Sequence, residues 1–242
     1  WLDARTGPPG VVLFPLALLL SVLAAGEYLW LVSARDLKPL RWVVYAGSLL
    51  TVSANWVAVL IPDTALQMLG WPFAAMGLSL LLAMLGEMSR YESPGEVMER
   101  LALAFLGIGY VGLLLSFVCQ LRLLGPQHDG AWGIAAITSL VVTVKMCDIG
   151  AYTVGRLIGR HKMAPVLSPG KTLEGAAGGI AFACLGSWLA LAVLLPKMVA
   201  DPPHVGWWWI PFGIIVGLAG MMGDLAESLI KRDVDRKDSS SW

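Results

Sequence analysis

The final apolar stretch of the chain carries polar side chains at helical spacing. Asp224, Ser228, Lys231 and Asp235 lie at i, i+4, i+7 and i+11, so a helix through this segment places them on one face. A carboxylate at the centre of a membrane-spanning helix costs about 2.5 to 3.5 kcal/mol on insertion scales. We therefore expect Asp224 to have a partner or a function. Interfacial anchoring alone would explain Lys231 and Arg232, but it would not explain the acid and the hydroxyl beside them.

A second acid and a basic connection lie upstream. Asp148 and Tyr152 are four residues apart in another apolar run, and the connection 160–174 carries Lys171 among several basic residues. A plain cytoplasmic loop would also be basic, so this charge alone indicates little. The run SPGKTLEG within the connection is more specific than its charge.

The two acids are recessed to a similar depth. At a helical rise of 1.5 Å per residue, Asp224 lies about 10 Å deeper than Lys231, and Asp148 lies about 12 Å deeper than Arg156. Basic side chains above two sunken carboxylates suit a phosphate-bearing substrate held with a divalent cation, because lysines neutralise phosphate oxygens and carboxylates bind the metal.

The sequence Gly170-Lys171-Thr172 invites comparison with a nucleotide-binding P-loop. The first glycine of that motif would fall at 165, which is Pro165, and no strand is expected before it. We therefore do not predict a P-loop. Thr172 or Ser168 is expected to cap the following helix, whose N-terminus could attract phosphate.

The composition defines the class of protein. Hydrophobic residues make up 57% of the 242 residues, charged residues make up 14%, and the mean hydropathy is +0.72. These values indicate a polytopic membrane protein. The formal net charge is zero, so no nucleic-acid partner is expected. Three scattered cysteines and three scattered histidines predict neither a disulfide framework nor a zinc site.

We predict an all-α fold with seven membrane-spanning helices. The apolar runs long enough to span a bilayer are 11–32, 41–61, 65–88, 100–121, 131–155, 173–196 and 207–230. If the first run enters from outside, 13 of the 17 Lys and Arg residues fall in the inner connections, so these connections are expected to be cytoplasmic. We divide the chain into an N-terminal scaffold, 1–130, and a catalytic region, 131–242.

Glycines predict close helix packing in the last two runs. Gly175 and Gly179 lie four residues apart in the sixth run, and the seventh run contains Gly213, Gly217, Gly220 and Gly223. Because glycine lets helix backbones approach closely, we expect these two runs to pack together.

Over 148–241 the sequence resembles the CDP-diacylglycerol synthases, also called phosphatidate cytidylyltransferases. The motifs that carry the resemblance are Asp148-Ile-Gly-Ala-Tyr152, Gly155-Arg156, Ser168-Pro-Gly170-Lys171-Thr172-Leu-Glu174-Gly175, Gly178-Gly179, Gly223-Asp224-Leu-Ala-Glu227-Ser228, Lys231-Arg232 and Lys237-Asp238. Before residue 148 the resemblance is topological.

The resemblance implies transfer of a cytidylyl group from CTP to phosphatidic acid, with Mg²⁺ and a possible second cation. It implies a homodimer in the bacterial cytoplasmic membrane, among membrane lipids, with its site on the cytoplasmic side. The residues to which it assigns catalysis are Asp224, Ser228, Lys231 and Arg232. Those to which it assigns substrate binding are Asp148, Tyr152, Ser168, Lys171, Thr172, Glu174, Lys237 and Asp238. The resemblance assigns metal binding to Asp224 and Asp148. For Asp148 a second role stays open, in which it orients Lys171 or Tyr152 instead.

The sequence departs from the family pattern in two places. The family signature continues beyond Lys-Asp into a Pro-Gly-His-Gly-Gly turn and an acidic segment that completes the metal site, so we expect the C-terminal part of the family fold to be missing from this chain. Gly170 stands where many members carry lysine, which would weaken the binding of CTP.

Three other functions are weighed against this one. A CTP-dependent lipid kinase of the dolichol or phytol type would transfer the γ-phosphate instead, but Asp148-x-x-Ala-Tyr152 and Lys237-Asp238 argue against it. A transporter would explain the two intramembrane acids and leave the basic connection unexplained. A structural subunit would need only the small-residue faces, and would tolerate the loss of Asp224.

Overall fold

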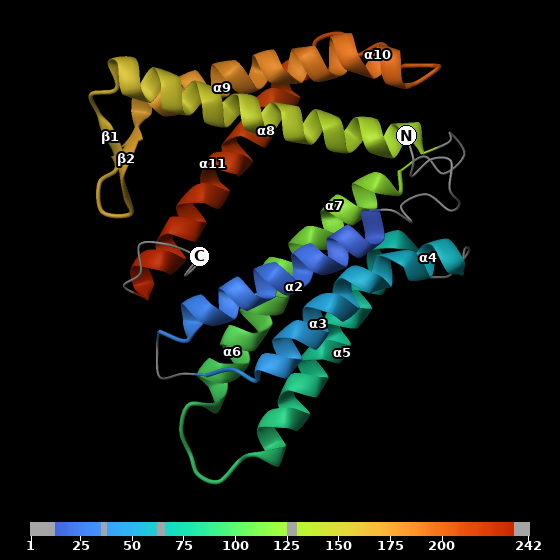
Figure 1. The fold of residues 1–242 in the computed structure, drawn as a ribbon, viewed down its shortest axis with the longest axis vertical. Coiled ribbons are helices and arrows are strands. Elements are labelled where there is room, and N and C mark those ends of the chain that lie inside the picture. The colour runs from blue at the N-terminus through green and yellow to red at the C-terminus, as the bar shows by residue number, and fades with distance from the viewer. Residues whose placement is uncertain (1–12, 35–37, 62–65, 125–129, 235–242) are drawn as a thin grey trace. The chain divides into compact units, whose positions relative to one another are not determined.

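The computed structural model describes residues 13–34, 38–61, 66–124 and 130–234. It contains seven helices that are long and apolar enough to cross a membrane (Figure 1). These are Leu13–Val32, Arg41–Leu60, Leu69–Ser89, Val97–Arg122, Ala131–Ile158, Leu173–Met198 and Trp209–Asp233. The predicted all-α polytopic membrane fold is confirmed, and each predicted span overlaps one of these helices.

The described chain divides into two compact units, one ending at Leu123 and the other covering Leu124–Asp233. The first unit contains α2 (Leu13–Val32), α3 (Arg41–Ser53), a 3-10 turn η1 (Ala54–Trp56), α4 (Val57–Leu60), α5 (Gln67–Ser89), α6 (Val97–Gly107), a π-helical turn η2 (Ile108–Leu113) and α7 (Leu114–Arg122). Helix α3 packs against α2, α5 and η2.

Two buried polar side chains in the first unit are stabilised by a backbone carbonyl or by opposite charges. The hydroxyl of Tyr28 donates a hydrogen bond to the Leu103 carbonyl at 2.6 Å. The carboxylate of Glu87 is 3% exposed and forms ion pairs with Arg90 and Arg100. Such pairing is what a buried carboxylate requires, so we regard this cluster as structural.

The second unit is built on two long helices joined by a hairpin. Its elements are α8 (Ala131–Ile158), β1 (Lys162–Ala164), β2 (Ser168–Thr172), α9 (Leu173–Trp188), a π-helical turn η3 (Leu189–Leu194), α10 (Leu195–Met198) and α11 (Trp209–Asp233). Among the helices and strands that the structure describes, α8 and α9 share the most extensive contact. Figure 1 shows these helices side by side, with the hairpin at one end of the pair.

Glycines set the short distance between α8 and α9. A methyl group at Gly150 would lie 2.4 Å from Phe182 Cβ and 2.7 Å from the Gly178 carbonyl oxygen. One at Gly175 would lie 2.8 Å from the Ala151 carbonyl oxygen. Only hydrogen fits at these positions, so the backbones meet directly, as close packing in a bilayer permits.

Helix α11 packs on α9 through half of its predicted glycines. A methyl group at Gly213 would lie 2.7 Å from Cys184 Cα, and one at Gly217 would lie 3.0 Å from Ala183 Cβ. Added methyl groups at Gly220 and Gly223 meet nothing within 4 Å. The prediction that all four glycines mediate close contacts is therefore wrong for these two, because α11 diverges from α9 as it approaches Asp224.

The connection 160–174 is an ordered antiparallel hairpin that the sequence did not predict. Lys162 pairs with Thr172 and Ala164 with Ser168, with an irregularity in the register between them. Strand β2 runs directly into α9, which begins at Leu173. The hairpin thereby places Ser168 and Lys171 at a defined distance from the start of a helix.

Candidate functional site

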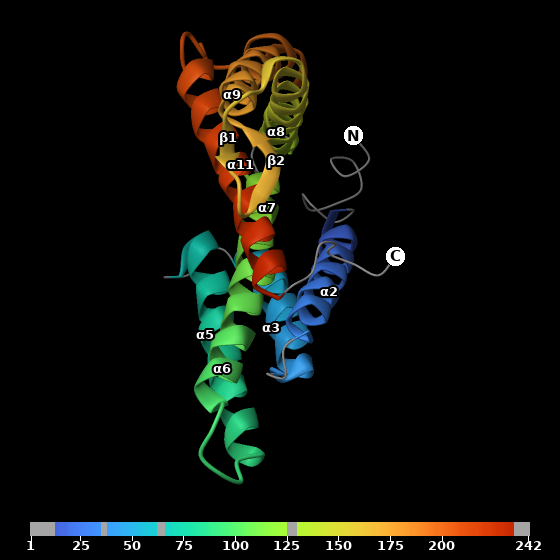
Figure 2. The same ribbon diagram turned by 90° about the vertical axis from the view of Figure 1, so that its left-hand side faces the viewer.

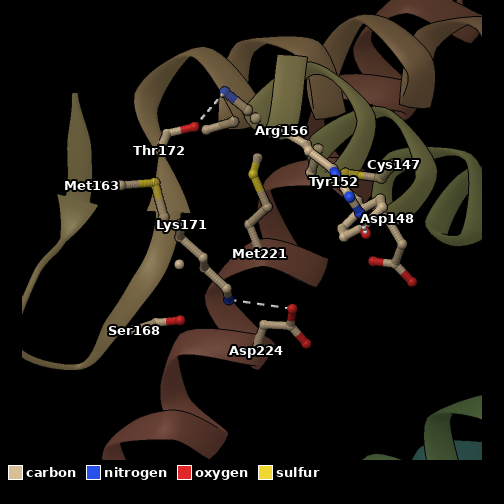
Figure 3. Close-up of a pocket in the computed structure, with 15 residues that line it drawn as sticks. Cys147, Asp148, Tyr152, Arg156, Met163, Ser168, Lys171, Thr172, Met221 and Asp224 are labelled. Atoms are coloured by element: carbon tan, nitrogen blue, oxygen red, sulfur yellow. Dashed lines mark hydrogen bonds and ion pairs between the residues drawn. The ribbon is translucent and has the colours of Figure 1, made fainter. Parts of the chain in front are cut away.

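A cleft of about 680 Å³ lies within the second unit (Figure 3). Its walls come from α8, both strands of the hairpin, the first turn of α9 and the middle of α11. The lining residues are Cys147, Asp148, Ala151, Tyr152, Gly155, Arg156, Met163, Ser168, Gly170, Lys171, Thr172, Gly175, Ala176, Met221 and Asp224.

Six residues predicted from the sequence therefore share one cleft, although they come from three elements, α8, β2 and α11. They are Asp148, Tyr152, Ser168, Lys171, Thr172 and Asp224. The volume is within the range of 300–1,000 Å³ that is typical of small-molecule sites.

Opposite charges from distant segments meet at the centre of the cleft. Lys171 on β2 points toward Asp224 on α11, and its Nζ lies 3.2 Å from Asp224 Oδ2 (Figure 3). The Lys171 Nζ atom is buried and makes no hydrogen bond within the part of the chain that the structure describes, although this ion pair places it beside the carboxylate. Asp224 keeps 60% of its side chain exposed. The contact thus leaves both groups with unused capacity for a ligand.

The wall formed by α8 presents an acid, a phenol and a guanidinium at successive turns. Arg156 donates a hydrogen bond from Nη1 to the Tyr152 hydroxyl at 2.6 Å, and its Cζ lies 5.9 Å from the centre of the tyrosine ring. Asp148 is 52% exposed and lies 3.4 Å from Lys145 Nζ. The pairing with Tyr152 orients the Arg156 cation on the cleft wall, where it could bind a phosphate oxygen.

Arg156 was not predicted as a site residue, although the motif Gly155-Arg156 was noted. Its spacing of eight residues from Asp148 places it on the same helical face, and this signal was available in the sequence. Met163 and Met221 also line the cleft and were not predicted. Methionines within apolar runs carry no sequence signal for such a position.

The start of α9 is capped as expected, by Thr172. Its Oγ1 accepts a hydrogen bond from the Gly175 amide at 3.1 Å, and its backbone is extended, as at a typical N-cap. Of the two candidate caps, the structure selects Thr172. Ser168 lies instead on β2 and lines the cleft.

Four other predicted residues lie outside the lining of the cleft. The Ser228 hydroxyl donates to the Asp224 carbonyl at 2.8 Å, and Lys231 Nζ lies 2.5 Å from Glu227 Oε1. Arg232 Nε donates to the Leu167 carbonyl at 3.4 Å, which ties the end of α11 to the hairpin turn. Figure 2 shows the hairpin beside α11. The carboxylate of Glu174 is turned to the base of the hairpin.

The predicted pair Lys237 and Asp238 lies outside the described residues, as does Asp235. The roles predicted for the residues outside the cleft lining remain predictions.

Two carboxylates are the metal-binding groups that the cleft offers. The described residues contain no cluster of three or more His, Cys, Asp or Glu side chains suited to a metal ion. Magnesium nevertheless needs only one or two protein carboxylates when substrate phosphates and water complete its octahedron. The hard oxygen donors of Asp148 and Asp224 therefore fit Mg²⁺ bound together with a phosphate ligand.

The fold and the cleft define a polytopic membrane protein that gathers acidic and basic side chains in one cleft. The sequence matches the cytidylyltransferase family over residues 6–242, and the chain belongs to that family.

Similar curated proteins carry one name, phosphatidate cytidylyltransferase. The protein of Chlamydia trachomatis is 40% identical over 104 residues, which cover 42% of this chain and 33% of that protein. Those of Bacillus subtilis and Brucella suis are 34% identical over 132 residues and 37% identical over 129 residues. These matches cover 54% and 53% of this chain and 45% of each relative. The matched part thus spans less than half the length of each of these relatives.

Proposed function

We propose that the protein transfers the cytidylyl group of CTP to phosphatidic acid and so produces CDP-diacylglycerol and pyrophosphate. The observation that carries the proposal is the meeting of Lys171 and Asp224 in one cleft with Asp148. Membership of the cytidylyltransferase family and the shared name of the relatives support this choice of reaction.

The reaction needs no nucleophile from the protein. A phosphate oxygen of phosphatidic acid forms a bond to the α-phosphorus of CTP, and the bond from that phosphorus to the oxygen bridging to the β-phosphate breaks. Pyrophosphate leaves with the electron pair of the broken bond. Positioning and cationic stabilisation supply the catalysis in such a transfer.

In this proposal the basic residues of the cleft bind phosphate oxygens and the acidic residues bind the metal ion. Lys171 binds the nucleotide phosphates, and Arg156 offers a second cation on the opposite wall for an anionic oxygen. Asp148 and Asp224 would hold Mg²⁺, which when bound neutralises phosphate charge and orients the phosphates. Tyr152 holds Arg156 in place.

The lipid substrate determines the membrane location that we propose for the cleft. A diacyl lipid must reach the cleft from the bilayer, so we place the protein in the bacterial cytoplasmic membrane with the cleft toward the cytoplasm, where CTP is made. The homodimer implied by the family resemblance belongs to the same proposal.

The test uses CTP labelled on the α-phosphate, incubated with the full-length purified protein, phosphatidic acid and magnesium. Label should appear in the organic phase, and should be absent when phosphatidic acid is omitted or EDTA is added. A parallel reaction with γ-labelled CTP should leave the lipid unlabelled. Lipid labelled only from the γ-position would instead identify a lipid kinase, and a protein that binds no CTP would overturn the proposal.

A further inference from the structure

The side chain of Glu174 is committed to the base of the hairpin. Its Oε2 accepts hydrogen bonds from the backbone amides of Arg160 at 3.1 Å and His161 at 3.2 Å. Its Oε1 accepts from His161 Nδ1 at 2.6 Å. Both carboxylate oxygens are therefore engaged by two consecutive residues that lie before β1.

These contacts leave Glu174 poorly placed to bind a substrate directly. Its side chain is 23% exposed, and it is absent from the lining of the cleft that contains Lys171 and Thr172. A ligand contact would require giving up charge-assisted hydrogen bonds, which are about twice as strong as neutral ones.

The contacts of His161 and Glu174 join the two chain segments at the base of the hairpin, one before β1 and one after β2. The carbonyl of His161 accepts from the Leu173 amide at 2.9 Å, while its amide and ring donate to Glu174. His161 is thus bound on both sides to the first turn of α9. Lys162 then pairs with Thr172, the cap of that helix.

Lys171 depends on this arrangement for its position. It precedes the capping residue by one position on β2, and its ammonium group reaches Asp224 on α11. A hairpin that pivoted at its base would carry the ammonium group away from the carboxylate. Short two-stranded hairpins are marginally stable alone, so the base must be held by other contacts.

We propose that Glu174 and His161 form a positioning pair that holds the hairpin and presents Lys171 to the phosphates of the nucleotide. Neither residue touches the substrate. The identity of that nucleotide as CTP rests on the proposed function; the effect on the hairpin does not.

The test measures amide hydrogen exchange and steady-state kinetics on the same full-length variants. Glu174→Ala and His161→Leu should accelerate exchange in the segment 160–172 and raise KM for CTP by roughly tenfold, with kcat changed less than about twofold. His161→Asn keeps a donor near the Nδ1 position and should restore most of the affinity. Since His161 is 76% exposed, its variants are expected to fold.

A matched control is available in the first unit. Glu99 lies in the first turn of α6, the same helix position that Glu174 occupies in α9, and its side chain is exposed. Glu99→Ala should leave both KM for CTP and exchange in 160–172 unchanged. The double variant of Glu174 and His161 should be no worse than Glu174→Ala, because paired residues lose one shared interaction.

Three results would overturn the inference. One is an unchanged rate of amide exchange in the segment 160–172 of both single variants. This result would overturn the inference even if the protein makes CDP-diacylglycerol. A second is faster exchange with an unchanged KM for CTP. The third is a loss confined to kcat, which would point to a direct role of Glu174 at the reacting atoms. The exchange measurement needs no substrate, so accelerated exchange would support the pair even if the nucleotide were not CTP.

Discussion

The contact between Lys171 and Asp224 is suited to exchange partners rather than to hold the fold together. Asp224 is more than half exposed, and partly exposed ion pairs contribute about 0 to 1 kcal/mol to stability. The carboxylate can therefore turn to a cation, and the ammonium group to a phosphate, at small cost. If the cleft binds a metal–nucleotide complex as proposed, this pairing gives each group a counter-ion when no ligand is bound.

Asp224→Asn tests the role of the Asp224 charge in metal binding, because asparagine has nearly the same shape as aspartate. Because the amide cannot neutralise a divalent cation, we expect cytidylyl transfer to fall by at least about 100-fold, with insertion and expression unchanged. The assay is label transfer from α-labelled CTP into lipid. Asp201→Asn, at an exposed position outside the cleft, is the control and should be fully active. Activity retained by Asp224→Asn at saturating magnesium would remove this residue from the metal site.

Lys171→Met tests the cation. Loss of a charged contact to phosphate should lower kcat/KM for CTP by about 10- to 100-fold, chiefly through KM. The initial rate as a function of CTP concentration measures it. Lys197→Met removes an exposed lysine from α10 and should have no effect. An unaltered KM in the Lys171 variant would exclude β2 from the nucleotide site.

Individual site residues could be predicted where their chemistry conflicts with their surroundings. Asp148 and Asp224 are acids in apolar runs, and that conflict is visible in the sequence. The contact of Asp224 with Lys171 was not visible, because it depends on how the hairpin leaves α8. The partner of Lys231 is Glu227, four residues earlier, and this spacing could have been recognised.

At the scale of elements, helix α9 is the centre of the second unit, since α8 and α11 both pack on it. Hydropathy predicts these helices well because an apolar run must form all its backbone hydrogen bonds internally within a bilayer. The hairpin escaped prediction because its strands are three and five residues long and contain Pro169 and Gly170. Glycine spacing predicts that helices approach, but the divergence of α11 after Gly217 depends on tertiary packing.

Gly150→Ala tests the direct contact of α8 with α9. The new methyl group would meet Phe182 Cβ at 2.4 Å and backbone at 2.7 Å, so overpacking should cost about 1 to 3 kcal/mol. Thermal unfolding in detergent should show a lower Tm. Gly220→Ala is the matched change, since its methyl group meets nothing within 4 Å and alanine favours a helix. Equal Tm values for the two variants would contradict the observed helix contact.

Gly170→Lys tests the hairpin as a platform for cations. The position lines the cleft, and an added Cβ meets nothing within 4 Å, so the side chain should be accommodated without strain. A second lysine next to Lys171 should lower KM for CTP by about two- to fivefold, and more so at low salt. Gly170→Met adds similar bulk without charge and should leave KM unchanged. A KM that rises in the lysine variant would show that the hairpin does not face the phosphates.

At the scale of the whole molecule, the number of spans and the charge of the connections together predict orientation. Seven spanning helices were predicted, and the described residues contain seven helices long and apolar enough to cross a membrane, yet the helices alone do not indicate which side faces the cytoplasm. The bias of basic residues toward alternate connections supplies that information. This bias predicts that the connection after Ser89 and the connection 160–174 face the cytoplasm, and that the connection before Trp209 faces the other side of the membrane.

Labelling of single introduced cysteines by a membrane-impermeant thiol reagent tests this orientation. Val166 at the tip of the hairpin is 86% exposed, and His204 is exposed in the connection before α11. In intact spheroplasts of a protein whose native cysteines are changed to alanine, His204→Cys should be labelled at once. Val166→Cys should react only after permeabilisation, because the hairpin is expected in the cytoplasm. The opposite pattern would put the cleft on the side of the membrane that lacks CTP, and the proposed reaction could not then occur there.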